Sequence, residues 1–169
     1  MNKIVLLRIQ GLVVLIPVFF LLLENVGAQG TDVSDMEKEA LTYFQQKEYA
    51  KALPLYNKLL VSYPRDPKYN YYAGVSMVEL GQEPEKAIYR LKIASLKKVP
   101  EDVFFYLGRA CYQAGRYDEA IRWYERFGEK ASAGTRKEYH ADKYLAEAQM
   151  AQQQKQSERP PAAAPHKFS

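Results

Sequence analysis

A period of 34 residues is the feature that most restricts the fold of this chain. Small residues recur at that spacing, at Ala40, Gly74 and Gly108, and each lies inside a segment whose apolar residues have helical spacing. A second small residue follows 12 or 13 positions later, and a bulky residue comes four positions after that. These second sites are Ala52 with Tyr56, Ala87 with Leu91, and Ala120 with Tyr124. A repeat of this length predicts helix pairs that stack on one another.

Helical spacing continues from Thr31 to Gln156, and no stretch alternates as a strand would. Turn residues divide it, which predicts helices over 34–46, 49–62, 67–80, 84–97, 102–114, 117–130 and 135–155. Asp66 before Pro67 is typical of an N-cap with proline at the first helical position. Ser34 with Glu37, and Thr135 with Glu138, have the spacing of capping boxes.

The segment LGRACYQAGRYDEAIRWYERF, residues 107–127, combines bulky aromatic residues with small ones at Gly108, Ala110, Ala114 and Ala120. We expect helices of neighbouring pairs to cross closely at these positions, at axis separations of about 8–10 Å. The aromatic rings would then fill the space beside them. Packing therefore explains the small residues without a ligand.

The helix-turn-helix period of 34 residues resembles that of the tetratricopeptide repeat family. The matching residues are Ala40, Tyr43, Ala52, Tyr56 and Pro64 in the first unit and Phe104, Leu107, Gly108, Ala120 and Tyr124 in the third. The second unit matches least well, with Asn70, Ala73 and Met77 at positions where the family prefers large apolar residues or tyrosine, and the third ends in Ser132 instead of proline. The resemblance implies an all-α, right-handed solenoid of three helix pairs, over 34–66, 67–100 and 101–134.

The helix over 135–155 has no partner, and we expect it to cap the third pair. The apolar residues available for this are Tyr139, Ala141, Leu145, Ala148 and Met150. A stacked array needs such a cap for solubility, so we expect a monomer; self-assembly through the array ends would instead give a dimer. Residues 156–169 are rich in proline and bury little, which predicts a disordered tail or linker.

The first 28 residues have the features of a secretory signal peptide, followed by a short lead over 29–33. Lys3 and Arg8 precede an apolar run from Gly11 to Leu23, and Val26 and Ala28 are small residues at the exit. The run has 13 residues, fewer than the ~20 that a spanning helix needs. An uncleaved membrane anchor is the alternative, if residues 4–7 also insert. We expect export, to the periplasm or outer membrane of a Gram-negative envelope.

The sequence offers little for catalysis or for cofactors. Cys111 is the single cysteine, so no intrachain disulfide forms, and its position on the core stripe favours a buried thiol over a nucleophile. His140 and His166 are not at metal-ligand spacing, and no phosphate-binding glycine loop occurs. The 24 basic and 20 acidic residues interleave, which argues against nucleic acid as a partner. We expect no enzyme activity, no cofactor and no metal.

A second stripe on each first helix, at i, i+4 and i+7, is the candidate binding site. The resemblance implies that these positions face a concave groove in which family members take extended peptides or partner helices. The candidate residues are Leu41, Phe44, Tyr71, Val75, Val78, Phe105, Arg109, Tyr112, Tyr139 and Lys143. Contiguous apolar residues on a surface favour an interaction site, although the same residues could pack against the neighbouring first helix. The family's clamp for a peptide carboxylate is not matched, since Asn70 and Arg109 do not form that set.

A narrower resemblance links the third unit, EDVFFYLGRACYQAGRYDEAIRWYERF, to the N-terminal segment of certain bacterial outer-membrane proteins. Those proteins continue into a β-propeller and an OmpA-like domain that binds peptidoglycan, and neither follows here. The sequence thus predicts a non-catalytic adaptor of the bacterial envelope that binds a protein or peptide in its concave groove. A membrane-tethered scaffold and a truncated part of a larger peptidoglycan-associated protein are the alternatives.

Overall fold

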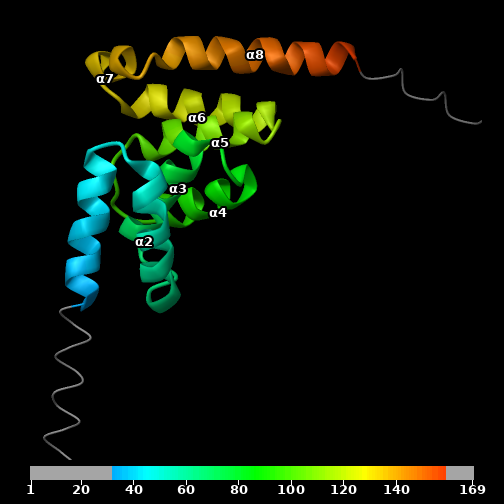
Figure 1. The fold of residues 1–169 in the computed structure, drawn as a ribbon. Coiled ribbons are helices and arrows are strands. Elements are labelled where there is room, and N and C mark those ends of the chain that lie inside the picture. Colours follow the sequence, from blue (N-terminus) through cyan, green and yellow to red (C-terminus); the bar gives the residue numbers. More distant parts are fainter. Residues whose placement is uncertain (1–31, 159–169) are drawn as a thin grey trace, which may run out of the picture.

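The computed structural model describes residues 32–158, and the helices in this range follow one another without a strand (Figure 1). The chain is helical over 32–45 within the described range. The helices that follow are α2 (Tyr49–Ser62), α3 (Pro67–Leu80), α4 (Pro84–Ser95), α5 (Val103–Gln113), α6 (Tyr117–Lys130), α7 (Ala133–Glu138) and α8 (Ala141–Ser157). The expected signal peptide, and the tail beyond residue 158, lie outside the described residues.

The helices form sequential antiparallel pairs, so the predicted all-α solenoid of three pairs is confirmed. Each helix from α2 to α6 packs mainly on its neighbours in the chain, and the first helices α3 and α5 also contact each other. The final helix α8 lies along α6, where Figure 1 shows it as the outermost layer of the stack. Most packing therefore involves segments close in sequence.

The small residues of the repeat lie where two helices of one pair meet. A Cβ atom at Gly108 in α5 would lie 2.4 Å from ring carbons of Tyr124 in α6. A Cβ atom at Gly74 in α3 would lie 2.6 Å from Cγ of Leu91 in α4. The closest approach at Gly108 is thus within its own pair, and the expectation of a crossing between neighbouring pairs there is wrong. The physical reason is that the bulky residue opposite each glycine comes from the second helix of the same unit.

Two of the three predicted helix caps differ from the structure. The carboxylate of Asp66 accepts a hydrogen bond of 2.8 Å from the backbone N–H of Tyr69, so the predicted cap before Pro67 is confirmed. Ser34 lies inside a helix that already includes residue 32. The cap near residue 135 is Ser132, whose hydroxyl accepts from the N–H of Thr135, three residues before the expected start.

The single helix expected over 135–155 is interrupted at His140. This residue has φ of 50°, a left-handed conformation that costs a non-glycine residue free energy and that ends α7. The interruption allows Tyr139 to pack on Phe105, with ring centroids 4.9 Å apart, while α8 turns along α6. The face of α8 against α6 buries Ala141 and Ala148, whereas Met150 is 61% exposed and does not contribute to the cap as expected.

Candidate functional site

Four of the residues predicted to line the groove are buried between helices. Tyr71, Val75 and Val78 of α3 and Phe105 of α5 are at most 5% exposed, so a partner does not reach them in this structure. Their stripe lies where the first helices α3 and α5 contact each other. The prediction of an open apolar groove is therefore wrong for these four, because neighbouring first helices approach closely enough to cover the stripe.

The other predicted residues remain at least partly accessible but do not form one apolar strip. Leu41, Phe44, Arg109, Tyr112 and Tyr139 are half-buried, and Lys143 is exposed. Tyr112 packs on Tyr117 within its own pair, with ring centroids 5.4 Å apart. Lys143 pairs with Glu147 one turn further along α8. What the structure brings together instead is a set of polar contacts between successive first helices.

The first of these contacts joins the helix over 32–45 to α3. Glu37 accepts a hydrogen bond of 2.5 Å from the ammonium of Lys68 and one of 2.9 Å from the hydroxyl of Tyr69. The hydrogen bond from Lys68 is the main cause of the lowered pKa of Glu37. The positive charge of Lys68 is therefore largely balanced within the molecule.

The second contact joins α3 to α5. Arg109 donates to Glu79 at 2.5 Å, and the two side chains are only 20% and 23% exposed. The guanidinium also lies 5.8 Å from the ring centroids of Tyr106 and of Tyr144, the latter in α8. Arg109 is thus held by one carboxylate and two rings, which fixes its position on the first-helix side of the stack.

The third contact centres on Asp102, at the N-terminus of α5. Its two carboxylate oxygens accept hydrogen bonds of 2.7 Å from the hydroxyls of Tyr71 and Tyr139. Burial raises the pKa of both tyrosines, and the charge of Asp102 raises them further. Tyr106, one turn into α5, has its ring 6.4 Å from that of Tyr139 in an edge-to-face arrangement. We call Tyr71, Asp102, Tyr106 and Tyr139 the Asp102 cluster.

The sequence did not predict several of these residues as parts of a site. Lys68, Glu79, Asp102 and Tyr106 were not candidates, although each is polar or aromatic and lies on a first helix or at its start. A usable signal was present, because the bonded partners Glu79–Arg109 and Tyr71–Asp102 are 30 and 31 residues apart, close to one repeat length. Complementary side chains at that offset indicate contacts between stacked repeats.

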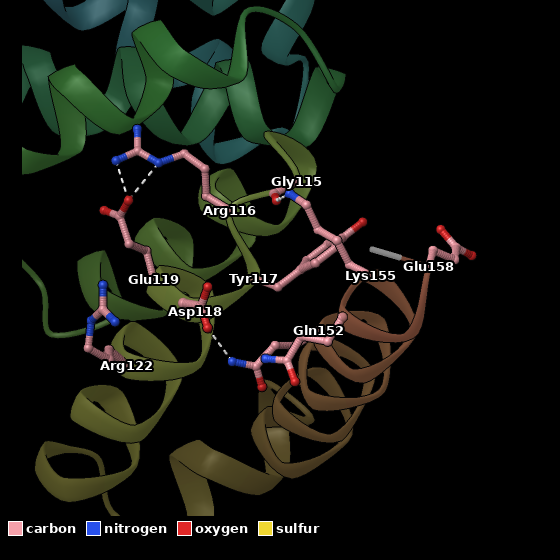
Figure 2. Close-up of a pocket in the computed structure, with 10 residues that line it drawn as sticks. Gly115, Arg116, Tyr117, Asp118, Glu119, Arg122, Gln152, Lys155 and Glu158 are labelled. Atoms are coloured by element: carbon pink, nitrogen blue, oxygen red, sulfur yellow. Dashed lines mark hydrogen bonds and ion pairs between the residues drawn. The ribbon is translucent and has the colours of Figure 1, made fainter. Parts of the chain in front are cut away.

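A cavity lies elsewhere among the described residues, between the start of α6 and the end of α8 (Figure 2). It has a volume of about 900 Å³ and is lined by residues 115–119, 122, 152, 155, 156 and 158. Lys155 donates to the carbonyl of Gly115 at 2.8 Å, and Gln152 donates to Asp118. Cationic and anionic side chains mix around it, and none of the predicted groove residues lies there.

The single cysteine of this chain is shielded from solvent. Cys111 is fully buried, and burial raises the pKa of its thiol to about 11, which suppresses the reactive thiolate. No group of three or more potential metal ligands converges in this range. No helix within residues 32–158 has the length and apolar character required to span a bilayer.

The arrangement of helices in this chain is similar to that in known proteins. The family described as "Anaphase-promoting complex, cyclosome, subunit 3" matches residues 45–127, from the turn before α2 through most of α6. The Sgt2 TPR domain from Aspergillus fumigatus superposes with a TM-score of 0.56 at 22% identity, over 82% of this chain and 91% of that one. This chain therefore has the helical repeat fold of TPR domains.

Two further structures are similar to this chain. A variant of MamA has a TM-score of 0.53 at 27% identity, with 60% of this chain and 74% of that chain covered. The first TPR domain of Spaghetti (RPAP3), bound to the HSP90 peptide SRMEEVD, has a TM-score of 0.56 at 20% identity, over 72% and 95% of the two chains. At 20% identity, the similarity to the RPAP3 domain shows a shared fold alone. No curated protein matches this chain in sequence.

Proposed function

We propose that this TPR protein is a non-catalytic module that binds a peptide or a partner helix on the face formed by its first helices. The observation that carries this proposal is the side-by-side packing of first helices α3 and α5, with partly exposed aromatic and charged side chains along it. Tyr49, Tyr106 and Tyr139 are half-buried there and come from α2, α5 and the end of α7. Tyrosines of this kind offer a large apolar ring and a polar tip, which suits protein recognition.

The likeness to a peptide-bound TPR domain is in line with this proposal. Filling two or three sites between such rings, at about 1.5–3 kcal/mol for each large side chain buried, supports micromolar binding before ordering costs.

The cellular setting that we propose is the bacterial envelope. It rests on the sequence of residues 1–28, with its basic start, apolar run and small-residue exit. Intact mass of the protein purified from an envelope fraction tests it, because cleavage predicts a chain that begins near Gln29. A full-length mass would favour the tethered scaffold.

Binding is tested by affinity capture with the tagged full-length chain, followed by identification of the captured proteins by mass spectrometry. The comparison is with Tyr106→Ala and with Tyr89→Ala, since Tyr89 is 65% exposed and belongs to α4, the second helix of its pair. We expect a partner that binds the wild type and Tyr89→Ala but is lost with Tyr106→Ala, while circular dichroism shows all three folded. Equal capture by all three would remove the site from the first-helix face.

A further inference from the structure

One charged side chain on the first-helix face, that of Asp102, has no partner of opposite charge among the described residues. Glu37 is matched by Lys68, and Glu79 is matched by Arg109. Asp102 has no lysine, arginine or histidine of residues 32–158 within 4.0 Å, and both of its oxygens accept only tyrosine hydroxyls. The Asp102 cluster therefore carries a net negative charge on a half-buried carboxylate.

The orientation of Asp102 directs this charge away from its own helix. As the residue that precedes α5, it could cap the helix by accepting from a first-turn N–H, but its side chain makes no such bond. It points instead to Tyr71 of α3 and to Tyr139 at the end of α7. The helix dipole offsets part of the negative charge, yet the hydrogen bonds of the carboxylate lie between the first helices.

The surroundings of the cluster add aromatic faces, and the guanidinium of Arg109 lies 5.8 Å from the ring centroid of Tyr106. The rings of Tyr106 and Tyr139 stand nearly perpendicular, at 86°. Burial is the main cause of the raised pKa of Tyr106, and the carboxylates of Glu79 and Asp102 both raise it further. The hydroxyls of Tyr49 and Tyr106 form no hydrogen bond with another described residue, so both remain available to a partner.

Carboxylate and aromatic rings together are what a cationic group requires for binding in a partly desolvated site. We infer that the first-helix face recognises its peptide through a lysine or arginine side chain, which binds at the Asp102 cluster against Asp102, Tyr106 and Tyr139. This inference rests on the proposed function and specifies its ligand. The complementary conclusion concerns acidic peptides: Lys68 and Arg109 are both engaged by carboxylates, so this face offers no free cation between α3 and α5 for a peptide carboxylate.

The test is selection from a displayed library of random heptapeptides on the full-length chain, followed by titration of the enriched peptides. We expect enrichment of lysine or arginine at one position, and no binding of a heptapeptide made only of acidic and neutral residues. Asp102→Asn should weaken the enriched peptides at least tenfold, because it removes the charge and keeps the side-chain size. Replacing the basic residue of the peptide by norleucine should have an effect of similar size, and the two changes together should be far from additive.

Two control variants separate charge from packing. Tyr139→Phe removes one hydrogen bond to Asp102 but leaves the ring and the carboxylate charge, so it should weaken the enriched peptides less than Asp102→Asn does. Glu125→Gln removes an exposed carboxylate of α6 that has no ion pair with another described residue, and it should change nothing.

The outcomes distinguish the two proposals. Enriched peptides that lack a basic residue, or that bind Asp102→Asn as tightly as the wild type, would overturn the cation site while leaving a peptide-binding face intact if Tyr106→Ala still abolishes binding. Binding that survives Tyr106→Ala as well would contradict both proposals, as would a selection that enriches nothing.

Discussion

Gly108→Ala is the substitution that tests the packing of the repeat most directly. The added Cβ atom would lie 2.4 Å from Cδ1 and Cε1 of Tyr124 and 2.9 Å from Cζ. Carbon atoms in contact prefer about 3.5–4.0 Å, so the ring or the helix must move by about 1 Å. Tyr124 is 2% exposed, and its ring packs against buried Phe105 and half-buried Tyr144. Overpacking of this kind costs roughly 1–3 kcal/mol.

Helix propensity acts in the opposite direction, because alanine is about 1 kcal/mol better than glycine in a helix interior. Gly128→Ala in α6 is therefore the matched control, since its Cβ atom would meet nothing closer than Cδ of Arg136 at 4.0 Å. We expect the control to be neutral or slightly stabilising. The free energy of unfolding of Gly108→Ala should lie about 1–3 kcal/mol below that of the control.

The assay is thermal unfolding of both variants followed by circular dichroism. At about 4 °C per kcal/mol, the two melting temperatures should differ by roughly 4–12 °C. Gly108→Leu should lower stability further, since it adds three more carbon atoms at the same contact. Equal melting temperatures for Gly108→Ala and Gly128→Ala would refute the reasoning, because they would mean that Tyr124 yields at no cost.

Two further predictions concern a helix cap and the buried thiol. Asp66→Ala removes the acceptor for the N–H of Tyr69 and should lower the free energy of unfolding by about 1 kcal/mol in urea titration; a loss below about 0.3 kcal/mol would show that the cap contributes little. Cys111 should react slowly with iodoacetamide at pH 8, because burial blocks access and raises its pKa to about 11, and denaturant should accelerate the reaction sharply. Since the folded pKa exceeds the unfolded value near 8.5, ionisation of this thiol should also reduce stability as pH rises from about 8.5 towards 11. Rapid native labelling would contradict the burial.

The repeat architecture could be predicted from the sequence because close packing imposes residue size. Gly74 and Gly108 each face a bulky residue of the following helix, and that pairing of small and large recurs at a fixed spacing. Asp66 before Pro67 was equally readable, since both residues act locally. The interruption at His140 could not be predicted in this way. The left-handed conformation of His140 follows from where Tyr139 packs and not from a turn residue in the sequence.

The candidate site was harder to predict for a geometric reason. Residues at i, i+4 and i+7 share one face of a helix, but that face is open or covered depending on how closely the next first helix approaches. Val75 and Phe105 are covered, although their spacing matches that of accessible Leu41 and Arg109. The distance between stacked helices depends on the side chains of two repeats. The pattern of residues within one helix therefore does not predict that distance.

The hydrogen bonds of Asp102 have a consequence for how the stack comes apart. In a linear array, each unit is stabilised by its own packing and by its interface with the next one. Asp102 joins α3 to the end of α7 through Tyr71 and Tyr139, so it adds to two interfaces at once. The short helix α7 buries no residue of its own and depends on such coupling. The C-terminal end of the array is therefore tied to the cooperative unfolding of the second and third units, and its amides should exchange with solvent in step with theirs rather than fray first.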